Sequence, residues 1–215
     1  IISHDLRSPM ASIKAGISLM LQMQVAGKDT KEVLSRLKKR TEETDYLLNN
    51  ILLWAKFQTS DVKPQKEDII YCQLQEFTES YFSLINEDKQ LLLHINWQGM
   101  PEAGIYCDLN QIQTVLRNLV SNAVKFTPAG KKITINSQLD ESNWKFSIVD
   151  EGEGMPQEKV VRLSCLETSA KNISTSGLGL QLVHEFLAHH NSKLEISSTQ
   201  GIGSEFGFTM PIHSI

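Results

Sequence analysis

Two asparagines and a lysine near the middle of this 215-residue chain stand at helical spacing. Asn118 and Asn122 are four residues apart, so a helix would place both carboxamides on one face, with Lys125 on a neighbouring part of that face. Amide oxygens can ligate Mg²⁺, and a lysine ammonium can neutralise a phosphate. On their own, the two asparagines would more simply be capping or solvated residues.

Three glycine-containing segments follow. Asp150 ends a predicted strand, where a carboxylate can accept a hydrogen bond from an exocyclic amine, and Gly152 and Gly154 let the backbone approach a flat ring. Residues 176–180 (Ser-Gly-Leu-Gly-Leu) open a predicted helix, whose free N–H groups suit a phosphate. Residues 201–206 (Gly-Ile-Gly-Ser-Glu-Phe) precede the last predicted strand. Each segment alone would more often be a turn than a site.

His4 lies near the start of the chain, in a segment with helical periodicity. It precedes Leu6 by two residues, roughly 200° around a helix, so it points away from the apolar seam that contains Leu6. Asp5 could accept a proton or orient the imidazole, and Pro9 would bend the helix locally. A neutral imidazole is nucleophilic near neutral pH, although a lone histidine on a polar face is ordinarily a surface residue.

Taken together and in this order, the asparagine segment and the three glycine segments resemble a known nucleotide-binding domain over roughly residues 65–210. Histidine kinases, the large ATP-dependent heat-shock chaperones, type II topoisomerases and MutL mismatch-repair proteins share that domain. Residues 4–9 (His-Asp-Leu-Arg-Ser-Pro) resemble the phosphoacceptor motif of histidine kinases. The chain therefore resembles the catalytic core of a sensor histidine kinase. A P-loop fold is excluded, because the sequence has no Gly-x-x-x-x-Gly-Lys-Ser/Thr motif.

The resemblance implies ATP and Mg²⁺ as cofactors and assigns the base-binding residues. Asp150 would bind the adenine amino group, with Ser204 helping through water. Gly152 and Gly154 would shape the pocket, and Phe126 would lie against the adenine ring.

The resemblance also assigns the residues near the phosphates. Asn122 would ligate Mg²⁺, Asn118 would support the metal shell or its water, and Lys125 would contact phosphate. The phosphate end of a flexible lid would consist of Gly177, Leu178 and Gly179.

The implied reaction is ATP-dependent phosphorylation of His4, followed by transfer to an aspartate in the receiver domain of a response regulator. Asp5 would act as the acid–base or orienting residue. Ser8, four residues after His4, would orient water for dephosphorylating the partner.

The lid departs from the usual family pattern of phenylalanines and an arginine. Leu163 and Leu166 could take the apolar role, and Arg162 or Lys171 could reach the γ-phosphate. A degenerate kinase that dimerises and signals with little turnover is therefore the alternative function. A chaperone-type or mismatch-repair ATPase would leave the His4 segment unexplained.

Two regions must position these residues, and the fold class they predict is α+β. Residues 1–60 read as a helical hairpin that serves as the dimerisation and phosphoacceptor domain, and residues 61–215 as the ATP-binding domain. The hairpin's apolar seam predicts a homodimer with a four-helix bundle, and the alternative is that the seam packs on the second domain. The seam is interrupted by Arg40, and its residues are Leu6, Met10, Ile13, Ile17, Met20, Val33, Leu37, Thr44, Leu47, Ile51 and Trp54.

The second region begins after a polar linker at residues 59–67 and alternates helices with strands, which predicts an α/β sandwich with a mixed sheet packed on helices. Asp108 would cap the strongest helix. Helices are predicted at residues 73–87, 109–126 and 177–190, and strands at residues 91–97, 105–107, 132–139, 144–149, 193–198 and 205–210.

The composition of the chain indicates which binding partners and which cellular compartment to expect. The formal net charge of −4 gives no general attraction to nucleic acid or to an anionic membrane. Cys72, Cys107 and Cys165 show no paired spacing, so we expect buried free thiols in a cytoplasmic location. Any membrane anchor would lie in a sensor region outside this sequence. His184 and His189 resemble a zinc motif but are five residues apart, which favours surface or packing roles.

Overall fold

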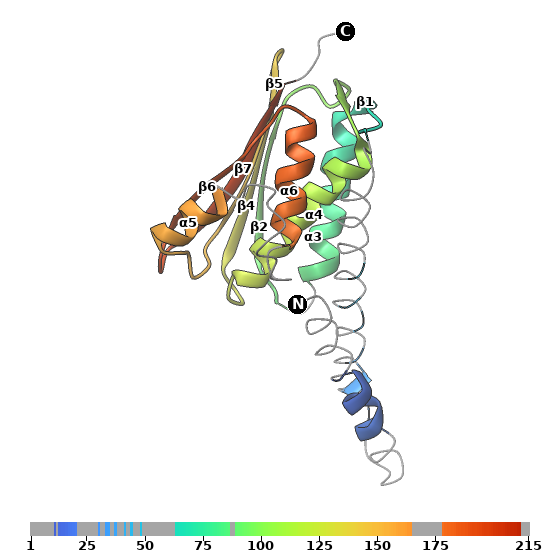
Figure 1. Cartoon of the computed structure of the whole chain (residues 1–215), viewed down its shortest axis with the longest axis vertical. Helices are drawn as coiled ribbons and strands as arrows, with labels where there is room; N and C mark the ends of the chain where they lie inside the picture. Colours follow the sequence, from blue (N-terminus) through green and yellow to red (C-terminus); the bar gives the residue numbers. More distant parts are fainter. Residues whose placement is uncertain are drawn as a thin grey trace. The chain divides into compact units, whose positions relative to one another are not determined.

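The chain forms two compact units, residues 1–62 with 170–179 and residues 63–169 with 180–215. The structure is a computed structural model (Figure 1), and the residues it describes are 11, 13–20, 30, 33, 34, 37, 41, 44, 48, 63–86, 89–164 and 178–211. Across these described ranges, no helix is long and apolar enough to span a bilayer.

In the first unit, two helical stretches approach each other closely. Residues 13–20 are helical, as are Leu34 and Leu37. A Cβ atom added to Gly16 would stand 2.6 Å from Cδ2 of Leu37, so the absence of a side chain at Gly16 allows this approach. Such packing is what the predicted hairpin requires.

The second unit contains a five-stranded sheet with the strand order β2-β4-β5-β7-β6 (Figure 1). β2 runs parallel to β4, and the remaining neighbours are antiparallel, so the sheet is mixed as predicted. Alternation of buried and exposed residues along β4 and β5 explains why these segments form strands with one covered face. The strands are β2 (Leu92–Gln98), β4 (Lys132–Leu139), β5 (Asn143–Asp150), β6 (Leu194–Thr199) and β7 (Gly203–Pro211).

A separate two-stranded sheet pairs β1 (Glu67–Ile70) with β3 (Gly104–Cys107) in antiparallel fashion. The last residue of the predicted linker, Glu67, therefore belongs to a strand, which corrects the linker boundary. Only Ile69 of β1 is buried, so the strand has too little apolar pattern to be predicted from sequence.

Helices α3, α4 and α6 cover one face of the large sheet (Figure 1). The helices are α3 (Tyr71–Asn86), α4 (Leu109–Phe126), α5 (Gln157–Ser164) and α6 (Leu178–His189). α4 packs against α3 and β5, whereas α5 lies against β6. α5 was not predicted, because Val160 is its one buried residue and the segment was read as part of the lid.

An aromatic cluster fills the core between this sheet and the helices. The Trp144 ring meets the rings of Phe208 and Tyr71 edge-on, with centroids 5.1 and 6.3 Å apart. Ser137 pairs with the polar atoms of Tyr71 and Trp144, since its Oγ lies 2.6 Å from the Tyr71 hydroxyl and accepts from Trp144 Nε1 at 2.8 Å. Hydrogen bonds of this kind offset the desolvation cost of buried polar groups.

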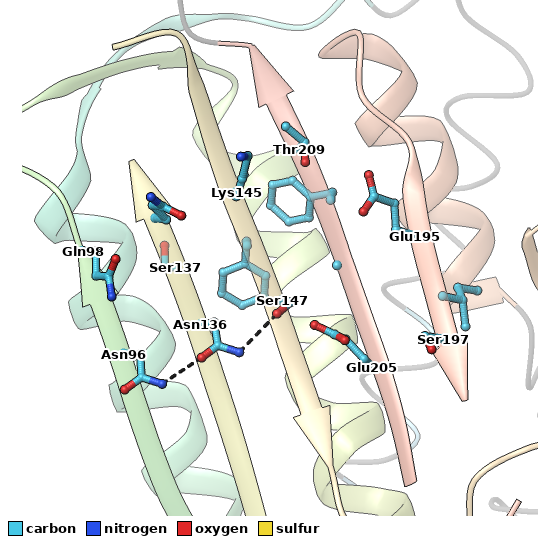
Figure 2. A pocket seen from close by; sticks show the side chains of 15 residues that line it. Asn96, Gln98, Asn136, Ser137, Lys145, Ser147, Glu195, Ser197, Glu205 and Thr209 are labelled. Atoms are coloured by element: carbon cyan, nitrogen blue, oxygen red, sulfur yellow. Dashed lines mark hydrogen bonds between the residues drawn. The ribbon is translucent and has the colours of Figure 1, made fainter. Parts of the chain in front are cut away.

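The other face of the large sheet is polar (Figure 2). A row of side chains crosses it, in which Asn96 donates to Asn136 at 2.8 Å and Asn136 donates to Ser147 at 3.3 Å. The row continues at Gly207, whose missing side chain contributes to a shallow hollow of about 470 Å³. Glu195 and Glu205 lie beside this hollow.

Candidate functional site

α4 carries four of the predicted site residues, and its first turn is fixed by Asp108. Oδ1 of Asp108 accepts the backbone N–H of Gln111 at 3.1 Å, as a helix N-cap does, and Oδ2 accepts that of Gln65 at 2.8 Å. The backbone N–H of Asp108 donates to Nε2 of His190 at 3.0 Å. The predicted cap is thus confirmed, and it also holds the segment before β1.

Asn118 and Asn122 differ in access although both stand on α4. Asn118 is 1% exposed, and its Nδ2 donates to the carbonyl of Thr114 at 2.8 Å, whereas Asn122 is half-buried. Asn122 is thus the more accessible carboxamide for a metal. The arrangement agrees with a ligand role for Asn122 and a supporting role for Asn118, and both roles stay predictions.

The C-terminal turn of α4 presents Lys125 and Phe126. Lys125 is exposed, with Nζ 5.3 Å from the centroid of the Phe126 ring, and Phe126 is 52% exposed. An accessible aromatic face next to an ammonium suits a flat ring attached to phosphates.

Lys89 closes the end of α4 and was missed at the level of sequence. Its Nζ donates to the carbonyl oxygens of Val124, Lys125 and Thr127 at 2.7, 2.9 and 3.1 Å. The last carbonyls of a helix lack intrahelical partners, so a lysine ammonium both satisfies them and complements the helix dipole. No local pattern indicated this contact, which spans about 35 residues of sequence.

Asp150 lies at the end of β5 with 5% of its surface exposed. Its Oδ1 accepts the backbone N–H of Gly152 at 2.8 Å, and its carboxylate also accepts the backbone N–H of Ser204. Burial raises the pKa of Asp150, and these two hydrogen bonds partly oppose that effect. A buried acceptor at a strand end is what recognition of an amino group requires.

The glycines after Asp150 leave no room for side chains. A Cβ on Gly152 would stand 2.5 Å from Oδ1 of Asp150 and 2.6 Å from the carbonyl oxygen of Phe126. Gly154 has a φ of 62° in the left-handed region, and a Cβ there would overlap the carbonyl of Thr199. The loop is therefore held between the end of α4 and the β6–β7 turn.

Ser204 and Ser198 continue the row that begins at Asp150. Asp150 is paired with Ser204 across β5 and β7, and Ser204 with Ser198 across β7 and β6. Ser198 Oγ donates to the carbonyl of Gly203 at 2.9 Å, accepts the N–H of Met155 at 2.8 Å and lies 3.0 Å from Ser204 Oγ. Ser198 was not predicted, because its contacts follow from strand register.

The remaining predicted residues are only partly described. Leu178 and Gly179 open α6, as predicted from sequence. Arg162 is exposed near the end of α5. The predicted residues outside the described ranges are His4, Asp5, Ser8, Leu166, Lys171 and Gly177.

The two histidines of the apparent zinc motif have separate contacts. Nε2 of His184 lies 2.9 Å from the carbonyl oxygen of Leu163, and Nδ1 of His189 lies 3.0 Å from Oε1 of Gln111. Each histidine therefore makes a contact of its own within the fold, which agrees with the surface or packing roles that their spacing favours.

The residues present fit an adenine nucleotide. The structure brings Asp150, Gly152, Ser204 and the carbonyl of Phe126 together, and a Cβ at Gly152 would collide with the Asp150 carboxylate and the Phe126 carbonyl. The hollow on the polar sheet face in Figure 2 is lined by other residues and is not this site.

Two family models match the chain. Residues 107–214 match the model described as histidine kinase-, DNA gyrase B- and HSP90-like ATPase, and residues 1–60 match the His kinase A phosphoacceptor domain. Sporulation kinase C of Bacillus subtilis is 30% identical over 99% of this chain. The chain covers 48% of that protein, so it spans about half the length of this curated relative.

Solved structures share the fold. The Acinetobacter baumannii histidine kinase AdeS has a TM-score of 0.70 at 22% identity, with 98% of each chain covered. The histidine kinase ThkA, solved in complex with the response regulator TrrA, has a TM-score of 0.71 at 18% identity, covering 99% of this chain and 60% of that one. At these sequence identities, the structural similarity shows a shared fold and nothing about function.

Proposed function

Because the chain belongs to the family of histidine kinase-like ATPases and carries a His kinase A domain before the ATPase domain, we propose that it phosphorylates its own His4 from ATP. The proposed phosphoacceptor and dimerisation domain is residues 1–60, and the proposed ATP-binding domain is residues 61–215. The observation that carries the proposal is the buried Asp150 carboxylate beside a glycine cradle, in a chain whose first residues match the phosphoacceptor model.

The base and the phosphates would be held by different elements. Asp150 would accept from the adenine amino group, Ser204 would assist it, and the exposed ring of Phe126 would stack on the base. Gly152 and Gly154 would keep this pocket open. When bound, ATP supplies the phosphoryl group that His4 accepts.

The phosphate end would be held by the last turns of α4 and the start of α6. Asn122 would ligate Mg²⁺ with Asn118 behind it, and Lys125 would offset phosphate charge. The lid residues Gly177, Leu178 and Gly179 would close over the phosphates through backbone N–H groups.

At the acceptor, Asp5 would hold the imidazole of His4 in its nucleophilic tautomer, as a carboxylate beside a histidine does. Ser8 would orient water when the phosphorylated partner is hydrolysed. The proposed next acceptor is an aspartate in a response-regulator receiver domain, which the complex of ThkA with the response regulator TrrA supports by analogy. The cytoplasmic location and a sensor region in a longer protein stay predictions.

Incubation of the full chain with γ-labelled ATP and Mg²⁺ tests the proposal. We expect acid-labile, base-stable label on the wild type and none on His4→Gln, with ATP affinity unchanged in that variant. Asn122→Ala is expected to lose labelling while keeping its fold, as judged by circular dichroism. Serine-directed or absent label on a folded, ATP-binding wild type would contradict the proposal, and dimerisation without label would favour the degenerate kinase.

A further inference from the structure

Three polar side chains stand opposite one another where β5, β7 and β6 meet. Asp150 pairs with Ser204, and Ser204 pairs with Ser198. Directly opposed residues of neighbouring strands project from the same face, so all three lie on the helix-covered face. Asp150 and Ser204 are 5% and 8% exposed, so each hydrogen-bonding position must be assigned to a protein or ligand partner.

The hydrogen of each hydroxyl can be assigned from its partners. A serine hydroxyl has one hydrogen and two lone pairs. The Gly203 carbonyl can only accept, so Ser198 donates its hydrogen there at 2.9 Å. The backbone N–H of Met155 can only donate, so it occupies one lone pair of Ser198 at 2.8 Å. Ser204, 3.0 Å away, must therefore donate its own hydrogen to the second lone pair of Ser198.

This assignment leaves Ser204 as an acceptor. Its hydrogen is used on Ser198, so its Oγ offers lone pairs to whatever binds beside it. We take the base itself to bind there, in place of the bridging water that is expected from the sequence. The ionised Asp150 carboxylate also accepts only. Asp150 and Ser204 therefore present two acceptors from paired positions of adjacent strands. An amino group, which carries two hydrogens, can donate to both, whereas the lone pairs of a carbonyl oxygen would be repelled.

We infer that Ser198 is a positioning residue that sets base specificity, because it holds Ser204 as an acceptor and so favours a 6-aminopurine over a 6-oxopurine nucleotide. The inference rests on the proposed ATP-binding function and adds a determinant that does not itself touch the base. Adenine carries an amino group at the 6 position and an N1 that accepts, whereas hypoxanthine carries an oxygen and an N1–H at these positions, and the two bases have the same outline. Without Ser198, the Ser204 hydroxyl could rotate and donate to that oxygen.

The test compares the affinities of the full chain for Mg·ATP and Mg·ITP by competition with a fluorescent adenine nucleotide. We expect the wild type to prefer ATP, and Ser198→Ala to lower the ATP-to-ITP affinity ratio about tenfold, the effect of one mismatched buried hydrogen bond. Ser198→Thr keeps the hydroxyl and should restore the ratio. Ser197→Ala is the matched control, since Ser197 is exposed on the opposite face of β6.

A double-mutant cycle shows whether the effect passes through Ser204. In a Ser204→Ala background, Ser198→Ala should leave the ratio unchanged. A ratio unchanged by Ser198→Ala in the otherwise wild-type chain, or one lowered further in the Ser204→Ala background, would overturn the inference.

Folding and nucleotide binding have separate controls. Thermal unfolding without nucleotide identifies a misfolded variant. If Ser198→Ala does not fold, Ser198→Cys, which keeps the volume but bonds weakly, should lower the ratio in the same direction, and no change would overturn the inference. A folded wild type that binds ATP without preferring it to ITP overturns this inference alone, whereas one that binds neither nucleotide overturns the proposed function as well.

Discussion

Asp150 combines burial with charge, and a raised pKa is the consequence. Because burial disfavours the ionised carboxylate, Asp150 does not stabilise the folded chain. Its role at this position is therefore to accept hydrogen bonds from a ligand. The pairing of Asp150 with a glycine cradle was predictable, because both stand in one short segment after a strand. The Ser198 contact was not, since it depends on which residue of β6 faces Ser204 across the sheet.

We predict that Asp150→Asn lowers ATP affinity by at least tenfold, because the carboxamide loses a charged acceptor worth about 1.5–3 kcal/mol. The free energy of unfolding at pH 7 should stay within about 1 kcal/mol of the wild type, because the buried charge is removed. Nucleotide titration and urea unfolding measure the two quantities. Asp68→Asn, at an exposed position of β1, is the matched control and should change neither.

The raised pKa of Asp150 also predicts a pH dependence of binding. Only the ionised carboxylate is a pure acceptor, so ATP affinity should fall on acidification as Asp150 takes up a proton. Because burial raises this pKa, the fall should begin at a higher pH than an ordinary aspartate would produce. ATP titrations from pH 8 to pH 4.5 with wild type and Asp150→Asn test this, and equal pH profiles for the two proteins would contradict it.

Cys107 offers a prediction about reactivity. It is fully buried, and burial, with smaller contributions from Asp108 and Glu67, raises its pKa to about 12. Since the thiolate is the reactive form, Cys107 should resist iodoacetamide at pH 8 in the folded protein, while the partly exposed Cys72 reacts faster. Peptide mass spectrometry before and after unfolding in urea compares the two, and equal native rates would refute the burial of Cys107.

At the scale of elements, α4 was the most predictable and the most informative segment. Its apolar periodicity and Asp108 cap fixed both ends to within a residue, because local chemistry determines them. β1 and α5 escaped prediction, since each has one buried residue and is held by partners distant in sequence. Lys89 shows the same limit, because it caps α4 from beyond the end of α3.

His190 joins the end of α6 to the start of α4 through hydrogen bonds. We predict that these contacts make the free energy of unfolding sensitive to acid. Nε2 accepts the Asp108 N–H, so Nδ1 must carry the proton and donate to the Phe186 carbonyl at 2.7 Å. Burial lowers the pKa of His190, whereas in the unfolded chain it titrates near 6.5. The unfolded chain therefore binds more protons below about pH 6.5, and stability should fall as the pH falls.

Urea unfolding at pH 7.5 and 5.5 measures this effect. The wild type should lose about 1 kcal/mol from His190 over this interval, and His190→Gln should lose correspondingly less. His94→Gln is the control, because His94 is exposed on the polar face of β2. Identical pH slopes for wild type and His190→Gln would show that His190 is not held neutral by this junction.

At the scale of the whole molecule, the two units have different needs for a partner. The second unit has its own aromatic and aliphatic core around both sheets. In the first unit, large apolar side chains are about half exposed in a single chain, namely Ile17, Leu19, Leu34 and Leu48. Apolar helical surface of this kind is usually buried by association, and Ile17 belongs to the seam that predicted a dimer, whereas Leu19, Leu34 and Leu48 lie outside that seam.

We predict that the chain is a homodimer and that Ile17→Glu weakens it by at least tenfold in dissociation constant, because the exposed half of Ile17 would be replaced by a desolvated carboxylate. Sedimentation over a range of concentrations measures the constant, with Ala15→Glu, at an exposed position about 200° around the helix from Ile17, as the control for one added negative charge. ATP affinity should not change in either variant, since the base-binding residues lie in the second unit. Ile17→Glu with wild-type dimerisation would mean that the seam is covered elsewhere, as it would be if it packed on the ATP-binding domain.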